Sequence, residues 1–252
     1  MDAPQIWPFP FWIAHRGAGR LAPENTLAAF RLGASCGYRA FECDVKLSAD
    51  QELFLLHDTA LERTTNGKGT AGDLIWAELS RLDAGAWHGP RFAGEPLPSL
   101  QAIADFVKAH GHALNLEIKP TPGTEAATGE AVGRACTRLW EGSTAALLLS
   151  SFEPEALQGA QASAPQVPRA LLLDKLWPDW LDAARSLGCV AVVTNHRLMD
   201  AALMAQLQHA GLRALCYTVN DAADARRLMA LGVHGLITDA VDWFMPVDGL
   251  MP

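Results

Sequence analysis

Cysteine is scarce in this sequence, and its spacing fits neither disulfide pairs nor a zinc site. The 252 residues include five cysteines, an odd number, and no two of them are spaced as CxxC. This argues against a zinc ribbon and against a disulfide framework. Cysteines inside apolar runs usually serve as small core residues, and unpaired thiols are typical of a reducing compartment.

Basic residues are also scarce. Lys and Arg number 20 against 28 Asp and Glu, which gives a formal net charge of −8. Proteins that bind nucleic acid gather Lys and Arg on one surface, so we expect no nucleic-acid partner. A small phosphate ester is compatible with this charge because it needs only a local positive site.

The sequence has no segment that resembles a signal peptide or a membrane span. Its first residues, MDAPQIWPFP, lack a charged start and a continuous apolar stretch. No run approaches the roughly 20 apolar residues that cross a bilayer, and no basic run suggests a polybasic tether. We therefore expect a cytoplasmic protein with no stable membrane anchor, and no pattern indicates its oligomeric state.

Several catalytic motifs are missing as well. There is no GxSxG elbow of serine hydrolases, no GxxxxGK[ST] phosphate loop, and no GxGxxG turn after the first predicted strand. Serine-hydrolase and nucleoside-triphosphatase functions therefore have no support. The last absence also weakens an open, doubly wound sheet, which is the alternative fold.

Apolar runs alternate with amphipathic stretches along the whole chain. Eight runs read as buried strands, at residues 12–15, 40–45, 113–118, 145–151, 170–173, 189–194, 214–219 and 235–238. Three predicted helices have recognisable ends, each with a capping residue at the start and a glycine at the end. The first begins at Asn25 or Thr26 and ends at Gly37, the second runs from Ser99 to Gly111, and the third begins at Asn220 or Asp221 and ends at Gly232. Eight strands alternating with helices predict an α/β fold, a TIM (β/α)₈ barrel.

One connection is longer than the others. Residues 58–98 are rich in Gly and Pro and follow a short predicted strand at residues 53–56. A connection of this length is usually functional or a small subdomain. We expect a single domain over residues 1–252, with an insertion at about residues 58–98 after the second barrel strand.

Two carboxylates occupy one face of the second predicted strand. Glu42 and Asp44 are two residues apart, so their side chains point the same way. Carboxylates side by side in a buried strand repel each other and lose hydration, and a hard cation such as Mg²⁺ or Ca²⁺ removes both costs. The alternatives are an exposed edge strand or paired salt bridges, and the apolar flanking residues argue against the exposed strand.

Other ionisable residues lie where predicted strands end. His15 and Arg16 follow the first strand, His57 follows the short strand, and Glu117 with Lys119 ends the third barrel strand. Barrel enzymes keep their active sites at these carboxyl ends. Each of these residues alone could be structural, but their common position predicts one site. The other six histidines do not share it, and we expect them to be structural or solvent-facing: His88, His110, His112, His196, His209 and His234.

Short motifs occur in a definite order along the chain. They read HRGAGRLAPENTLAAF, FECDVKLSADQELFLLHD, LERTTNGKG, LPSL, LNLEIK, SSF, YTVND and GVHGLITD. This order resembles the glycerophosphodiester phosphodiesterase family from Ile13 to Asp239, and the length resembles its compact bacterial cytoplasmic members. Two positions depart from the family pattern: Tyr217 stands where Trp is common, and His234 stands where Asp is common.

The resemblance implies a TIM barrel with a small insertion after the second strand. It implies hydrolysis of small-molecule glycerophosphodiesters to sn-glycerol 3-phosphate and an alcohol, with one divalent ion, Mg²⁺ or Ca²⁺, or alternatively Mn²⁺. By motif position it implies metal binding by Glu42, Asp44 and Glu117, acid–base catalysis by His15 and His57, and phosphate binding by Arg16 and Lys119.

Two other functions are compatible with such a barrel. A phospholipase D-like lyase shares the paired histidines and the metal, but would need an apolar approach for lipid, and no such segment is visible. A non-catalytic binding protein would be expected to have lost a histidine or a metal carboxylate, and all of them are present. The hydrolase is therefore the favoured prediction.

Overall fold

Eight parallel strands close into a barrel in the computed structural model, which describes residues 7–246. The barrel strands are β1 (Trp12–Ala14), β2 (Ala40–Leu47), β4 (Ala113–Ile118), β5 (Leu147–Ser151), β6 (Arg169–Leu173), β7 (Cys189–Asn195), β8 (Arg213–Tyr217) and β9 (Gly235–Thr238). Each pairs with its neighbours in this order, and β1 pairs with both β2 and β9, so the sheet is closed. The predicted TIM barrel is confirmed.

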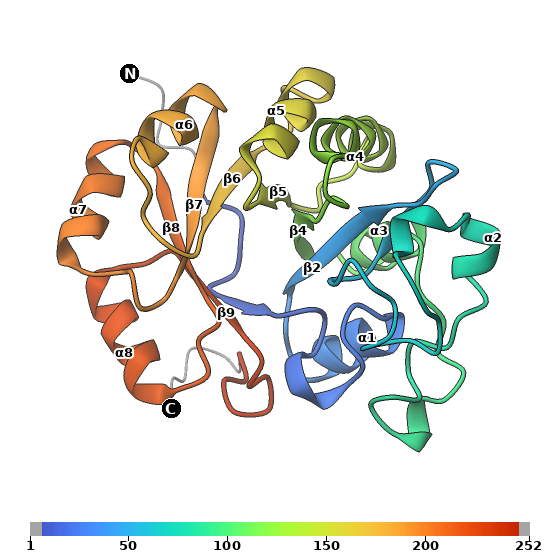
Figure 1. The fold of residues 1–252 in the computed structure, drawn as a ribbon. Helices are drawn as coiled ribbons and strands as arrows, with labels where there is room; N and C mark the ends of the chain where they lie inside the picture. The colour runs from blue at the N-terminus through green and yellow to red at the C-terminus, as the bar shows by residue number, and fades with distance from the viewer. Residues whose placement is uncertain (1–6, 247–252) are drawn as a thin grey trace.

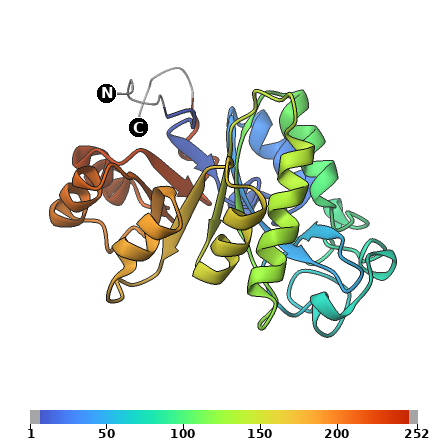
Figure 2. The same ribbon diagram turned by 90° about the horizontal axis from the view of Figure 1, so that it is seen from above.

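Helices surround this barrel (Figure 1). They are α1 (Leu27–Ser35), α3 (Leu100–Ala109), α4 (Glu125–Leu139), α5 (Pro154–Ser163), α6 (Trp180–Ser186), α7 (Ala201–His209) and α8 (Ala222–Leu231). In α3 the buried residues Leu100, Ile103, Ala104 and Val107 recur at helical spacing and turn one face inward. Helices α4 and α5 lie side by side (Figure 2), where a Cβ on Gly129 would lie 1.9 Å from the carbonyl oxygen of Ala156.

The strands are apolar on both faces because both faces are covered. Small and branched residues such as Ile13, Ala40, Leu148 and Val193 form one buried cluster inside the barrel. A larger cluster fills the layer between the strands and the helices. This double burial explains why the strands read as continuous apolar runs rather than as an alternating pattern.

The predicted helix ends are largely confirmed. The side chains of Thr26, Ser99 and Asp221 cap α1, α3 and α8, and glycines with positive φ follow the last helical turns. Asn25, the other candidate for the first cap, instead adopts φ +59° and points its side chain toward the site described below. Strands β4 and β9 have the predicted bounds, and the other six barrel strands differ by one or two residues at one or both ends, such as β5, which begins at Leu147, and β8, which spans Arg213–Tyr217.

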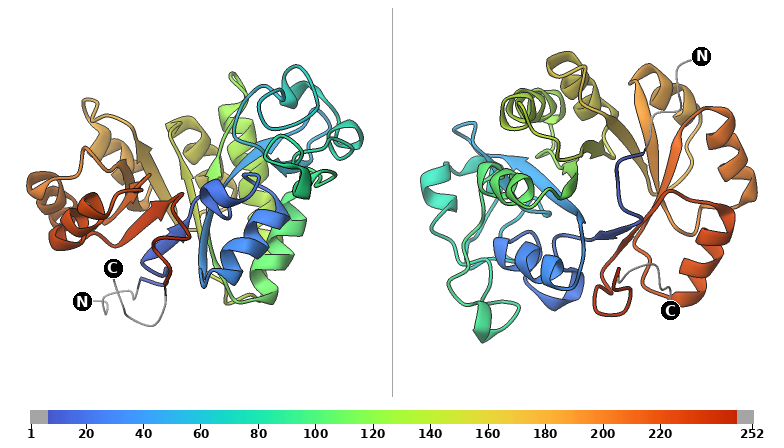
Figure 3. Two further views of the ribbon diagram at one scale, coloured as in Figure 1. Left: turned by 90° about the horizontal axis from the view of Figure 1, so that it is seen from below. Right: turned by 180° about the vertical axis from the view of Figure 1, so that it is seen from behind.

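The insertion after the second barrel strand is present. Strand β2 pairs antiparallel with β3 (Leu53–Leu55), and the chain then forms the short helix α2 (Trp76–Leu79) before it reaches α3. Phe54, Leu61 and Leu79 belong to a small core of its own. Figure 3 shows the insertion, coloured cyan to teal, to one side of the barrel, near α1 and α3.

Within residues 7–246 none of the helices combines the length and the apolar character that a bilayer span needs.

Candidate active site

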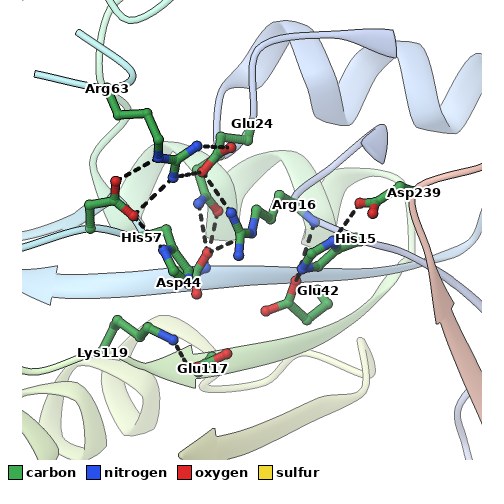
Figure 4. A network of polar contacts seen from close by, with 12 residues as sticks. His15, Arg16, Glu24, Glu42, Asp44, His57, Arg63, Glu117, Lys119 and Asp239 are labelled. Atoms are coloured by element: carbon green, nitrogen blue, oxygen red, sulfur yellow. Dashed lines mark hydrogen bonds and ion pairs between the residues drawn. The ribbon is translucent and has the colours of Figure 1, made fainter. Parts of the chain in front are cut away.

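Three carboxylates from two neighbouring strands meet at one end of the barrel. Asp44 of β2 is in register with Glu117 of β4, and Glu42 lies two residues before Asp44 on the same face. All three are buried, and each offers an oxygen within 4.8 Å of the others (Figure 4). The alternation of side chains along a strand therefore builds the cluster that the sequence predicts.

Burial and mutual repulsion disturb the ionisation of this cluster. Burial, together with the charges of Asp44 and Glu117, raises the pKa of Glu42 well above its ordinary value. Burial and the charge of Asp44 raise the pKa of Glu117 to about 7. Burial opposes ionisation of Asp44 too, but the positive charges of Arg16, His57 and Lys119 hold its pKa below the ordinary value.

Asp44 is held by two neighbours and keeps one oxygen free. The amide of Asn25 donates to its Oδ2 at 2.8 Å, and the Arg16 Nε lies 3.3 Å from the same oxygen. Its Oδ1 is buried and has no hydrogen-bond partner among the described residues. A buried carboxylate oxygen without a donor, beside two further carboxylates, is suited to a hard divalent cation.

Arg16 follows β1 in a backbone conformation with φ +49°. Its backbone N–H donates to Glu42 Oε2 at 3.2 Å, and its Nη1 donates to Glu24 Oε1 at 2.8 Å. Arg63 of the insertion binds the same Glu24 with two hydrogen bonds. The Arg16 guanidinium is thereby fixed at the edge of the carboxylate cluster, beside Asp44.

Each of the two histidines has its Nδ1 bound to a carboxylate. His15 Nδ1 lies 2.5 Å from Asp239 Oδ1, and His57 Nδ1 lies 2.6 Å from Asp58 Oδ1. The His15 Nε2 lies 3.7 Å from Glu42 Oε2, so this nitrogen faces the carboxylate cluster. A carboxylate on Nδ1 fixes the tautomer and leaves Nε2 to exchange protons.

Lys119 lies on the opposite side of the cluster from His15 (Figure 4). Its Nζ is 2.6 Å from Glu117 Oε1 and lies 5.1 Å above the centre of the Phe152 ring. All seven predicted side chains are thus brought together. A cavity of about 180 Å³ reaches six of them, and its walls include Phe152, Leu172 and Tyr217.

The sequence did not identify Glu24, Asp58, Arg63 or Asp239 as site residues. Asp58 follows His57 directly, and Asp239 directly follows β9, so strand-end position was a usable signal for both. The link from Glu24 to Arg63 joins the loop after β1 to the insertion, and no local pattern indicates it. None of the six remaining histidines lines the 180 Å³ cavity.

Comparisons with known proteins agree with this geometry. Residues 15–243 match the model of the glycerophosphoryl diester phosphodiesterase family. A glycerophosphodiester phosphodiesterase of Caldanaerobacter subterraneus is 31% identical over 232 residues, which cover 90% of this chain and 93% of that protein.

Solved structures resemble the fold closely. A phosphodiesterase of Oleispira antarctica, in complex with the product sn-glycerol 3-phosphate, has a TM-score of 0.85 and 33% identity, covering 92% of this chain and 93% of that one. A glycerophosphodiester phosphodiesterase of Agrobacterium tumefaciens has a TM-score of 0.80 and 28% identity, with coverage of 95% and 100%. The chain therefore belongs to the glycerophosphoryl diester phosphodiesterase family of hydrolases, the family that its motifs resemble.

Proposed function

We propose that this enzyme hydrolyses glycerophosphodiesters to sn-glycerol 3-phosphate and an alcohol, with one divalent ion and two-histidine acid–base catalysis. The observation that carries the proposal is the buried Glu42–Asp44–Glu117 cluster with a carboxylate-bound histidine nearby on each of two elements. Buried carboxylates this close together destabilise the folded protein unless a bound cation neutralises their charge.

Glu42, Asp44 and Glu117 would hold the divalent ion. All-carboxylate ligation favours Mg²⁺ or Ca²⁺ and also accommodates Mn²⁺. When bound, the ion supplies Lewis-acid stabilisation of negative charge on phosphate oxygens. The free Oδ1 of Asp44 supports this assignment, because a bound cation would satisfy this fully buried oxygen, which has no donor among the described residues.

Arg16 and Lys119 would bind the phosphate. Both are cationic and border the carboxylate cluster from two sides. Positive groups that are already oriented before substrate arrives stabilise the developing charge without reorganisation. Lys119 rests on the Phe152 ring, which limits its conformations.

His15 and His57 would move the protons. One takes a proton from the nucleophile, either water or the 2-hydroxyl of the glycerol, and the other delivers a proton to the leaving alcohol oxygen. Attack by the 2-hydroxyl first gives a cyclic phosphate, which water then opens to sn-glycerol 3-phosphate. Each transfer typically contributes about 10²–10⁴ in rate. Asp239 and Asp58 orient the two imidazoles through Nδ1.

The glycerol portion would occupy the 180 Å³ cavity. Phe152, Leu172 and Tyr217 give it an apolar wall, and Tyr217 donates to the Leu173 carbonyl at 3.2 Å, which fixes the phenol ring. The related Oleispira structure contains sn-glycerol 3-phosphate, the product proposed here. Because Tyr217 replaces a common Trp of the family, we expect it to influence substrate preference rather than activity itself.

The test uses purified protein and glycerophosphocholine, with release of sn-glycerol 3-phosphate as the measurement. We expect release with Mg²⁺, Ca²⁺ or Mn²⁺, loss of release with a chelator, and a loss of about 10²–10⁴ in His15→Ala. If the metal-loaded protein releases no sn-glycerol 3-phosphate from esters with several different head groups, the hydrolase function is refuted. Full activity of His15→Ala would refute the histidine's role and leave the hydrolase standing.

A further inference from the structure

A second lysine, Lys46, lies close to the carboxylate cluster, on the strand β2 that also carries Glu42 and Asp44. Lys46 follows Glu42 and Asp44 at the same two-residue spacing, so all three share one face of β2. The residue is 1% exposed, which is rare for lysine. The proposed catalytic roles above do not use it.

The two lysines near the site are partnered differently. Lys119 binds the Glu117 carboxylate at 2.6 Å, whereas the Lys46 ammonium makes one hydrogen bond within the described part of the chain, to the carbonyl of Lys119 at 3.1 Å. Asp44, Asp58 and Glu117 lie near enough to act on its charge. The proposed function assigns Asp44 and Glu117 to the cation, and Asp58 is bound to His57 and Arg63. Lys46 is therefore a buried positive charge without a carboxylate of its own, which is costly unless a ligand supplies one.

Lys46 lines a groove that leads away from the site. The groove has a volume of about 290 Å³ and shares His57, Glu117 and Lys119 with the catalytic cavity. Its two other carboxylates, Glu125 and Glu153, are more exposed than Lys46. Glu117 is buried as well but pairs with Lys119, so among the described residues of the groove Lys46 is the buried charge without an ion-pair partner. The groove begins beside His57, one of the two histidines proposed to transfer protons.

We propose that Lys46 is a specificity-determining residue that binds a second anionic group, a carboxylate or a phosphate, on the alcohol portion of the glycerophosphodiester. The proposal rests on the hydrolase function given above. An ester whose alcohol occupies the groove places its substituent beside Lys46, and hydrogen bonds to a charged group contribute enough to change affinity about 10- to 100-fold.

Two pairs of substrates isolate this contact. Glycerophosphoserine differs from glycerophosphoethanolamine by one carboxylate, and glycerophosphoglycerol phosphate differs from glycerophosphoglycerol by one phosphate. We expect kcat/KM of the wild-type enzyme to be about 10- to 100-fold higher for the member of a pair that carries the extra anion. A preference in the serine pair alone assigns the site to carboxylates, and one in the phosphate pair alone assigns it to phosphates.

Lys46→Met keeps the length of the side chain and removes the charge. We expect it to abolish the preference and to change kcat/KM for the two esters without the extra anion less than about threefold. Lys46→Arg should retain the preference, and exposed Lys68→Met controls for net charge. Lys119→Met provides the contrast, because loss of a phosphate contact should weaken all four substrates alike. If Lys46→Met does not fold, Lys46→Gln replaces it.

Direct binding gives a readout that is independent of turnover. In a His15→Ala background, calorimetry should show that Lys46→Met weakens glycerophosphoserine about tenfold or more and leaves glycerophosphoethanolamine unchanged. Equal kcat/KM within both pairs for the wild type would overturn the proposed role of Lys46, and so would an equal loss on all four substrates in Lys46→Met. Either result would leave the proposed hydrolase function unaffected. A wild-type enzyme that cleaves none of the four would instead refute the proposed function.

Discussion

The two ends of strand β4 carry buried polar groups with opposite surroundings: an isolated, neutral histidine at one end and a carboxylate in a charged cluster near the other. His112 directly precedes the strand, is 3% exposed, and has no hydrogen-bond partner on either ring nitrogen within residues 7–246. Burial lowers its pKa to about 4, so it stays uncharged. Glu117, near the other end, is also buried, but it lies with two more carboxylates and beside Arg16 and Lys119.

The difference separates a structural group from a functional one. The His112 ring packs with Phe41, Phe106 and His110, so it serves as an aromatic filler at the amino-terminal end of the barrel. No packing argument explains three carboxylates in mutual repulsion. The chain keeps them at a cost in stability, which is common where a site needs a strained arrangement. The predictions below test whether the two ends differ in this way.

Removing one carboxylate should have the largest effect. We expect Glu42→Gln to reduce phosphodiesterase activity at least about 100-fold, because a ligand of the proposed cation is lost. The same variant should stabilise the metal-free protein by about 1–3 kcal/mol, because a buried, repelled charge is replaced by an isosteric amide. Steady-state kinetics and thermal unfolding in a chelator measure the two effects.

Exposed Glu130→Gln is the matched control for Glu42→Gln. Glu130 forms a surface pair with Arg134, so its loss should change the free energy of unfolding by less than about 0.5 kcal/mol. If Glu42→Gln lost activity and also destabilised the metal-free protein, the carboxylate cluster would be a stabilising network, and the comparison of the two ends would fail.

The next effect concerns the carboxylate behind His15. Asp239→Asn retains the shape of the side chain but removes the charge that fixes the His15 tautomer, so we expect a loss of roughly 10- to 100-fold in kcat, less than for loss of the imidazole. KM should change little, because Asp239 does not line the 180 Å³ cavity. A rise in KM with an unchanged kcat would contradict the role of Asp239 in orienting His15.

Asp239 also shows where reading the sequence ends, because its position after a strand was a usable signal but its partner was not. Glu42 and Asp44 were predictable because strand alternation and apolar flanks are local properties of five residues. The contact of His15 with Asp239 joins residues 224 positions apart and exists only because β1 pairs with β9. Arg63 reaches Glu24 from an insertion whose course no periodic pattern indicates. The barrel and the cluster were therefore predictable, whereas the long-range contacts that orient the site, from Asp239 to His15 and from Arg63 to Glu24, were not.

A divalent cation should stabilise the protein more at pH 8 than at pH 5. The pKa of Glu117 is about 7 in the metal-free folded state, against 4.5 for an ordinary glutamate, so the folded protein binds more protons than the unfolded chain between these values. Stability from this group is present below pH 4.5 and is lost as pH rises to about 7. A cation requires the ionised carboxylates and removes that loss.

The measurement is the rise in Tm on adding saturating Mg²⁺ or Ca²⁺ at each pH. Taking the difference between loaded and metal-free protein cancels the titration of groups remote from the site. We expect the increment to be larger at pH 8 by about 1–2 kcal/mol of unfolding free energy. Equal increments at both pH values would show that the cluster is already ionised without a cation.

The smallest effect belongs to the other end of the barrel. The folded state keeps His112 neutral, with a pKa of about 4, whereas the unfolded chain protonates near 6.5, so stability is present above pH 6.5 and is lost as pH falls toward 4. We expect His112→Leu to add about 1 kcal/mol at pH 7, because an unsatisfied polar ring becomes apolar, and to add more at pH 4.5. Urea unfolding at both pH values measures this difference. Phosphodiesterase activity at pH 7 should not change, because His112 lies at the end of β4 opposite the carboxylates. If the variant is no more stable at pH 4.5 than the wild type, solvent must hydrogen-bond the nitrogens of the His112 ring. The two ends of β4 would then differ in charge but not in hydration.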